Sequence, residues 1–196
     1  MAVLLRHEDC TPLAPRAELL AAARSGAPGV HRPYLRCLAA GLRQLPSHYG
    51  GVLVTGPVEG CDPGAYVPGR VLVERAPVAG PAVPDAALGP GAGVEFVNWS
   101  LTGRRSSVFG APGEPPAVVL LPGAGFEVLD VRPSDPGPGP PPRVLLHEAG
   151  GVRPDLGRLE ERLARCDAVP PSGRIGPSDP ARYLLARGAR QPLPVR

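Results

Sequence analysis

Glycine and proline interrupt this chain so often that no regular element can be long. The 196 residues include 26 glycines and 29 prolines, a share in the range of roughly 25–30% at which disorder becomes a serious alternative to a folded domain. However, 43% of the residues are hydrophobic and only 20% are charged, so the short segments between the interruptions carry enough apolar surface for a core. The sequence therefore predicts a folded unit made of short helices and short strands.

The charged residues indicate a genomic bias rather than a nucleic-acid interface. All 21 basic residues are arginine, whereas asparagine and isoleucine occur once each, at Asn98 and Ile175. The abundant residue types are those with GC-rich codons, which indicates a GC-rich genome. Guanidinium groups suit phosphates, but the net charge is only +3 and Arg104-Arg105 is the single adjacent pair of arginines. We therefore expect no binding of nucleic acid.

Cysteine and histidine are too scattered to predict a metal site. No Cys-x-x-Cys pair and no zinc-like spacing occurs, although an even number of cysteines leaves disulfides open. Charged residues follow Leu5 at once, unlike in a signal peptide, and no apolar run approaches the roughly 20 residues of a membrane span. We expect a cytoplasmic protein that does not insert into membranes. The residues concerned are Cys10, Cys37, Cys61 and Cys166, with His7, His31, His48 and His147.

Helical patterns are confined to the two ends of the chain. Proline precedes the first of them, over residues 16–24, where it suits a helix start. Apolar residues at three- and four-residue spacing predict a second helix over residues 34–45, which Pro46 ends. A third helix is expected after Pro154 and Asp155, and a short last one over residues 178–186.

Between these ends, the pattern changes to short β-branched runs bounded by glycine and proline. The connections are too short for a helix between consecutive strands, which favours a mostly antiparallel sheet over a parallel doubly wound one. Two proline-rich stretches, residues 76–93 and 132–143, are interpreted as loops, and the second also suits a polyproline II ligand for a partner domain. The predicted strands cover residues 52–55, 70–75, 94–99, 117–121, 126–131 and 143–147.

The order of four segments between residues 34 and 148 resembles the mono-ADP-ribosyltransferase family, in particular its arginine-specific, toxin-like bacterial members. A helix that ends in Leu-Pro is followed by Tyr-x-Gly and a strand, and then by a Tyr-x-x-Gly turn. Further on come a Gly-Arg turn after the central strand and a Leu-Pro-Gly segment before Phe-x-Val-Leu. In this sequence they are Leu45-Pro46 with Tyr49-Gly50-Gly51, Tyr66-Val67-Pro68-Gly69, Gly103-Arg104, and Leu121-Pro122-Gly123 with Phe126-Glu127-Val128-Leu129.

The resemblance implies a fold and a site. The fold is α+β, with N-terminal helices, a split and mostly antiparallel β-sheet core, and a C-terminal helix. In the family, an arginine on the first strand orients NAD, and a Ser-Thr-Ser motif shapes the pocket. A Glu-x-Glu pair then stabilises the positive charge that develops on the ribose as nicotinamide leaves.

This sequence departs from the family pattern at all three places. The arginine falls on Thr55, the Ser-Thr-Ser motif on residues 77–80, and the Glu-x-Glu pair on residues 115–117. Glu114, one residue upstream of that pair, is the candidate catalytic carboxylate, and its alternative role is that of a solvated loop acid.

Other side chains are candidates for binding NAD in place of the missing groups. Arg70, Arg75 and Arg104 lie next to predicted strands and carry the charge that NAD phosphates need. Trp99, the only tryptophan, is expected on the central strand, largely buried against leucine and valine of neighbouring strands. Stacking of its ring on an adenine or nicotinamide is the alternative.

Three functions remain open. The leading hypothesis is a catalytically degenerate domain that acts as a binding or regulatory module toward an unidentified protein partner, with NAD as its candidate ligand. The first alternative is an active NAD-dependent mono-ADP-ribosyltransferase with a displaced catalytic set, so the sequence leaves open whether the chain is an enzyme. The second is a proline-rich interaction protein with little fixed structure. The expected domains are an N-terminal helical extension (1–30), an ADP-ribosyltransferase-like domain (31–150) and a C-terminal helical tail (151–196).

Overall fold

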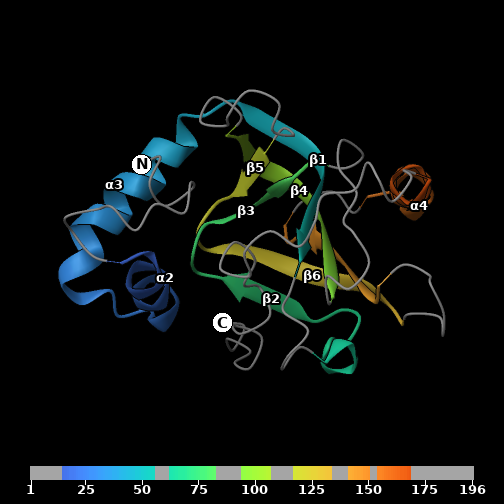
Figure 1. Cartoon of the computed structure of the whole chain (residues 1–196), viewed down its shortest axis with the longest axis horizontal. Coiled ribbons are helices and arrows are strands. Elements are labelled where there is room, and N and C mark those ends of the chain that lie inside the picture. Colours follow the sequence, from blue (N-terminus) through green and yellow to red (C-terminus); the bar gives the residue numbers. More distant parts are fainter. Residues whose placement is uncertain are drawn as a thin grey trace.

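The computed structural model describes residues 15–55, 62–82, 94–106, 117–133, 141–150 and 154–168. Helices lie toward both ends of this part of the chain and strands lie between them (Figure 1). The chain is therefore an α+β protein, as the sequence predicts. The helices are α2 (Arg16–Ser25), α3 (Arg32–Arg43) and α4 (Leu156–Asp167), with short 3₁₀ turns η1 (Gly29–His31) and η2 (Pro63–Ala65).

The strands overlap the predicted ones, with one addition. β1 begins five residues before its predicted start, and β4 continues through Arg105, so the turn expected at Gly103-Arg104 is wrong: pairing with β1 and β5 keeps these residues in the strand. Strand β3 lies inside residues 76–93, so the prediction of a loop is wrong for four of these residues. Its Gly80-Pro81 pair is typical of a turn, but β3 stands at an edge of the sheet, where proline is tolerated. The strands are β1 (Ser47–Thr55), β2 (Val71–Glu74), β3 (Val78–Pro81), β4 (Glu95–Arg105), β5 (Ala117–Leu120), β6 (Ala124–Arg132) and β7 (Arg143–Glu148).

Strand β4 is the centre of the sheet. It pairs antiparallel with β1, parallel with β7, and antiparallel with β5 through Arg104 and Arg105. The strand order is β2-β6-β7-β4-β5-β3, with β1 attached to β4. Among the described strands, β4 and β7 form the one parallel pair, so the expectation of a mostly antiparallel sheet is confirmed.

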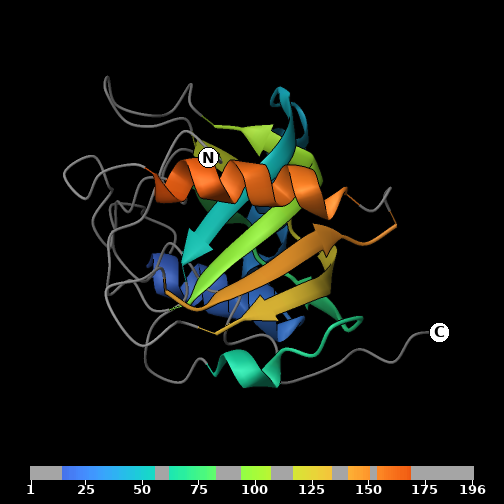
Figure 2. The ribbon, with the colours of Figure 1, turned by 90° about the vertical axis from the view of Figure 1, so that its right-hand side faces the viewer.

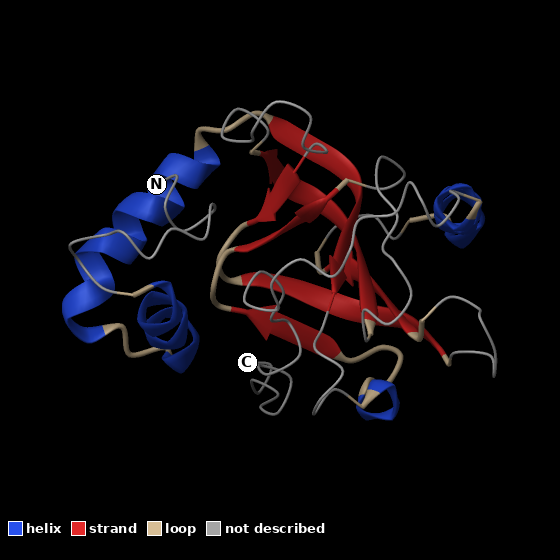
Figure 3. Ribbon diagram, in the orientation of Figure 1, coloured by secondary structure: helices blue, strands red, loops and turns tan. Residues whose placement is uncertain are grey.

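The sheet cannot be flat, because a very short connection joins its two edge strands. β2 and β3 stand at opposite ends of the strand order, yet only residues 75–77 separate them. The edges of six flat strands would lie about 24 Å apart at roughly 4.8 Å per strand. The four Cα steps from Glu74 to Val78 span at most about 14 Å. The sheet therefore curves, and Figure 3 shows its strands arranged around a common interior.

The curved sheet encloses an apolar core. Phe96 of β4 is completely buried, and its ring meets the ring of Tyr66 edge-on, with centroids 5.3 Å apart. Most other core residues are valine and leucine, because the chain contains few aromatic residues. The buried members are Val52, Tyr66, Val78, Ala82, Val94, Phe96, Val118, Leu120, Phe126, Val128, Val144 and Leu146. This buried core does not agree with the alternative of a proline-rich interaction protein with little fixed structure.

Helices cover the sheet from opposite sides (Figures 1 and 2). α2 and α3 form a second apolar cluster in which Leu19, Leu38 and Leu42 join Val119 of β5. α4 lies on the other side, where its Leu159 and Leu163 are buried. None of the helices among the described residues has both the length and the apolar character needed to cross a membrane. The predicted last helix (178–186) and residues 134–140 of the second proline-rich stretch lie outside the described residues.

Replacement of Phe96 by alanine tests whether this core holds the fold together. The phenyl ring has no exposed surface, so Phe96→Ala should lower the free energy of unfolding by about 3–5 kcal/mol. Val67→Ala, at a position that is 54% exposed, should change it by less than about 0.5 kcal/mol. Urea unfolding followed by circular dichroism measures both. Similar losses of unfolding free energy in Phe96→Ala and Val67→Ala would contradict the assignment of Phe96 to the core.

Candidate functional site

The described parts of the three segments that the resemblance assigns to NAD and catalysis lie on β1, on β3 and at the start of β5. β3 pairs with β5, with Pro81 opposite Ala117. β1 reaches the end of β3 through a bridge between Val52 and Ala82. Thr55 ends β1 three residues after this bridge. We refer to this place, defined by residues 52–55, 78–82 and 117–118, as the β1–β3–β5 junction.

The β3 and β5 residues of this junction are apolar. β3 reads Val-Ala-Gly-Pro, and β5 begins with Ala117 and Val118. Among these described residues no side chain can donate to a phosphate or set a negative charge against a ribose cation. Glu114, the candidate catalytic carboxylate, lies outside the described residues.

A buried ion pair lies in the same row of the sheet as Thr55. The Cα of Thr55 pairs with that of Glu95 on β4, which pairs in turn with that of Arg143 on β7. Arg143 Nε donates to Glu95 Oε2 at 2.7 Å, and both residues are buried. The guanidinium group that shares this row with Thr55 is thus bound by a carboxylate of the chain itself.

Trp99 lies on β4, as predicted, and is partly buried. The guanidinium carbon of Arg162, from α4, lies 5.3 Å from the centroid of the indole ring, within the range of a cation–π interaction. One side of the ring is therefore occupied by a residue of this chain. Stacking of Trp99 on a nucleotide base stays an untested prediction.

Glu74 is a buried carboxylate whose hydrogen bonding is incomplete. Its Oε1 accepts from the backbone N–H of Ala76 at 2.8 Å and from Arg24 Nε at 3.3 Å. Its Oε2 is buried, and no described residue donates to it. Burial raises the pKa of the Glu74 carboxyl above its ordinary value, and the Arg24 charge and the hydrogen bonds offset only part of that rise.

Arg75 and Arg70 flank β2, at the opposite end of the strand order from β3. The guanidinium of Arg75 reaches the C-terminal end of α2, where Gly26 ends the helix with φ +74°. A Cβ at Gly26 would lie 2.5 Å from a terminal nitrogen of Arg75, so only glycine allows this approach. Arg24, Glu74 and Arg75 together join α2 to the turn between β2 and β3. Arg70, which is partly buried, lies at the start of β2.

Glu148 organises the backbone of β4 where that strand passes beyond β7. Its Oε2 accepts from Ser100 Oγ at 3.1 Å and from the N–H groups of Leu101 and Thr102 at 2.7 and 2.8 Å. Its Oε1 accepts from the Thr102 hydroxyl. Gly103 N–H donates to Ser100 Oγ at 2.8 Å, which completes the network. Glu148 is therefore a structural carboxylate that is already saturated with donors.

The histidine and cysteine side chains described here do not assemble a metal site. His31 Nε2 lies 2.8 Å from Glu18 Oε1, and His147 Nε2 lies 3.0 Å from Glu127 Oε2. Cys37, on α3, is a free and exposed thiol. Across the described residues, no group of three metal-ligating side chains comes close enough to hold an ion.

Sequence reasoning missed Glu74, Glu95 and Arg143 as notable residues. A signal was present, since Glu95 and Arg143 each begin an apolar run and Glu74 ends one. A charged residue at the end of a buried strand is more often solvated than paired. Glu95 and Arg143 are 48 positions apart in the sequence. Only the pairing of β4 with β7 shows that their side chains meet.

Glu74→Gln tests the incomplete hydrogen bonding of this carboxyl. Because burial raises its pKa above the ordinary 4.5, the folded protein retains a proton there that the unfolded chain releases. The stability contributed by this group is present below the ordinary pKa and is lost as the pH rises through the folded-state pKa. Glutamine stays neutral, so the variant should lose less stability than the wild type over that interval.

Urea midpoints measured at several pH values from 4 to 8 give this comparison. Glu161→Gln, an exposed position on α4, is the matched control and should follow the wild type. A constant difference in unfolding free energy between wild type and Glu74→Gln at all pH values would count against the raised pKa.

Replacing Glu148 distinguishes its hydrogen bonds from its charge. Glu148→Ala leaves buried donors without an acceptor and should cost about 2–3 kcal/mol of unfolding free energy. Glu148→Gln keeps a carbonyl oxygen for the backbone N–H groups, and the Thr102 hydroxyl can turn to accept from the amide. Glutamine should therefore recover more than half of the loss in thermal or urea unfolding. Equal losses in both variants would show that the charge matters instead.

No protein-family model matches this sequence, and no curated protein sequence is significantly similar to it. Solved structures do share its fold. The ADP-ribosyltransferase HopU1 of Pseudomonas syringae pv. Tomato DC3000 superimposes with a TM-score of 0.54 at 16% identity, over 69% of this chain and 66% of HopU1.

Two other solved structures align less closely. The type III effector XopAI from Xanthomonas axonopodis pv. citri aligns with a TM-score of 0.48 at 21% identity, over 60% of this chain and 49% of its own. The Vis toxin, an ADP-ribosyltransferase from Vibrio splendidus, gives 0.45 at 18%, over 76% and 75%. The chain thus spans about half of XopAI and just under two thirds of HopU1. The similarity to HopU1 confirms the resemblance in the sequence: this chain has the ADP-ribosyltransferase-like fold.

Proposed function

We propose that this chain is a binding or regulatory module on the ADP-ribosyltransferase fold that does not transfer ADP-ribose at a useful rate. The observation that carries the proposal is the apolar character of the β3 and β5 residues at the β1–β3–β5 junction. There, the positions that the resemblance assigns to the family's hydroxyl motif hold Pro77, Val78, Ala79 and Gly80. We propose that residues 31–150 perform the role and that the partner is a protein.

The charges near this junction do not fit NAD as the family holds it. An arginine that orients a dinucleotide needs guanidinium donors free to meet a phosphate. Arg143, the arginine in the same row of the sheet as Thr55, donates to Glu95 instead. Loss of one well-placed electrostatic group typically lowers a rate by about 10²–10³. Several such losses need not multiply, but even one leaves a slow enzyme.

An active NAD-dependent mono-ADP-ribosyltransferase with a displaced catalytic set is the second candidate. The observation in its favour is that a carboxylate and a guanidinium, those of Glu95 and Arg143, lie in the same row of the sheet as Thr55. In that case, Glu114 is the carboxylate that would oppose the ribose cation, because it immediately precedes the segment that leads into β5.

Incubation of the full chain with labelled NAD and a mixed pool of protein acceptors tests the proposal. We expect no more label in the acceptors, and no more free nicotinamide, than with a boiled sample. An active mono-ADP-ribosyltransferase in a parallel reaction verifies the assay. Calorimetric titration with NAD, run separately, measures binding, and binding without transfer would support the proposal.

Two variants decide the result if label does appear. Transfer that disappears in Glu114→Ala but persists in the control Glu161→Ala would overturn the proposal in favour of the enzyme. Transfer that persists in both would equally refute a degenerate domain, and would place the catalytic carboxylate elsewhere.

A further inference from the structure

Helix α3 carries an unusual charge distribution for this chain. It contains three arginines and no acidic residue, whereas α2 contains Glu18 and α4 mixes arginines with Glu160 and Glu161. Arg32, Arg36 and Arg43 are four and seven residues apart, so at about 100° per residue they fall within about 40° of one another around the axis. At about 1.5 Å per residue, they extend over roughly 16 Å. We refer to these three residues as the α3 arginine stripe.

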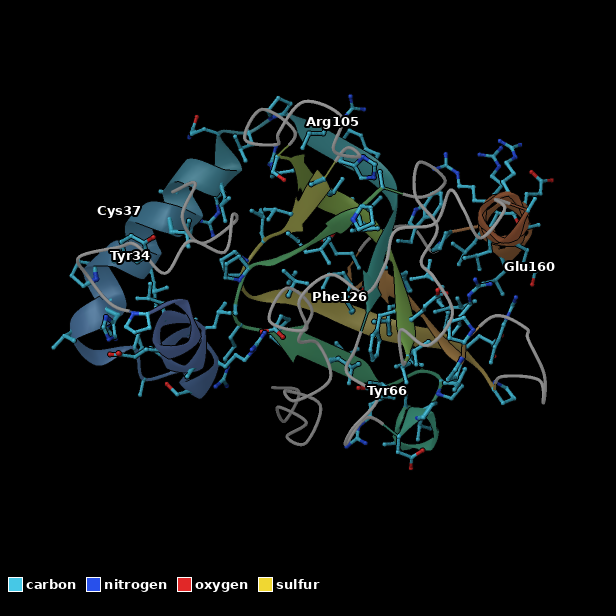
Figure 4. The ribbon with its side chains drawn as sticks, viewed as in Figure 1. Tyr34, Cys37, Tyr66, Arg105, Phe126 and Glu160 are labelled. Carbon is cyan, nitrogen blue, oxygen red and sulfur yellow. The ribbon has the colours of Figure 1, made fainter. Side chains whose placement is uncertain are left out.

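The stripe faces away from the rest of the described structure. All three of its residues are exposed, while Leu38 and Leu42 on another side of the helix are buried against α2 and β5. α3 lies at the side of the molecule opposite α4 (Figure 1). Figure 4 marks Cys37, also exposed, on the same helix.

The arginines of the stripe have no ionic partner among the described residues, in contrast to several arginines elsewhere. Arg24 contacts Glu74, Arg132 contacts Asp130 and Glu160, and Arg143 contacts Glu95. Arg162 covers the ring of Trp99. The structure thus uses many of its guanidinium groups internally but leaves the α3 stripe to solvent.

A fourth exposed arginine extends the positive charge beyond the helix. The backbone N–H of Arg105 donates to the carbonyl of Pro46 at 2.8 Å, which places the end of β4 just past the C-terminal end of α3. The neighbouring Arg104 instead turns back, and donates to Leu45 O and to Ser47 Oγ. Arg105 is labelled in Figure 4.

We propose that the α3 arginine stripe docks an acidic segment of a partner protein. Guanidinium groups bind carboxylates through two parallel N–H···O bonds. Three carboxylates on a partner helix, separated by four and then by seven residues, would match the spacing of the three arginines. A nucleic acid fits less well, because the net charge of the chain is only +3. Tyr34, the tyrosine of α3, is partly buried against the apolar cluster of α2, α3 and β5, so its ring is not an open stacking platform.

This inference rests on the proposed binding role, for which it names the chemistry of the partner. Its test does not measure NAD turnover, so the two proposals can fail separately. A chain that transfers ADP-ribose would still use the stripe to hold an acidic protein target. If the stripe does not bind the acidic peptide, a chain without transfer activity can still be a binding module, but its partner is not recognised through acidic residues at α3.

The test uses the full chain and a fluorescent helical peptide with glutamates at spacings of four and seven, otherwise alanine and glutamine. Binding is followed by fluorescence anisotropy at low salt. Arg36→Glu/Arg43→Glu should raise the Kd about tenfold. The matched control Arg158→Glu/Arg165→Glu, which changes two exposed arginines of α4, should raise it less than twofold. Added salt should weaken the wild-type interaction. Unchanged thermal midpoints would show that both variants fold.

Several results would overturn the proposal. One is the absence of binding to the glutamate peptide, or equal binding of a peptide with glutamine in its place. Another is an equal loss in the α3 and α4 variants, which would indicate net charge alone. Tighter binding of a labelled 20-base-pair DNA duplex, lost in Arg36→Glu/Arg43→Glu, would assign the stripe to nucleic acid instead.

Discussion

The three residues between β2 and β3 impose the constraint on which this fold depends. They join the two edges of the strand order, so the sheet has to curve until those edges approach each other. Curvature brings β1 to the end of β3 through the Val52–Ala82 bridge and turns one face of every strand toward a shared interior. A chain with few aromatic side chains can therefore fill its core with valine and leucine, because each contributes to one enclosed volume.

The same closure buries charged groups, which the structure treats in different ways. Glu148 receives backbone and hydroxyl donors from the segment of β4 that leaves β7. Glu95 is matched by Arg143. Glu74 receives two donors on one oxygen and none from the described residues on the other, which is why burial dominates its pKa. The buried acids among the described residues thus mainly hold backbone and strands in place.

The local sequence pattern predicted much of the fold, because glycine and proline mark where most strands and helices begin and end. Apolar spacing and the prolines placed α3 within a few residues, and the β-branched runs placed six strands. β3 escaped prediction because Gly80-Pro81 favours a turn in isolation, and only pairing with β5 supplies the hydrogen bonds of a strand. The resemblance places the family's first-strand site position at Thr55, which stays a prediction. Its charged neighbours were not predicted, because strand pairing rather than sequence distance brings Glu95 and Arg143 together.

The sequence alone determined where six of the seven described strands lie and that they pair mostly antiparallel. Its resemblance to the ADP-ribosyltransferase family predicts that the groups of the family's site are missing from their usual places. These properties are local: they depend on side-chain pattern, turn residues and residue identity at aligned positions. The tertiary structure decided which arginines are engaged and which stay free. Arginines that look evenly dispersed along the chain include ion-paired residues and, on α3, a stripe of three exposed ones, because helix periodicity and packing select the direction in which each side chain projects.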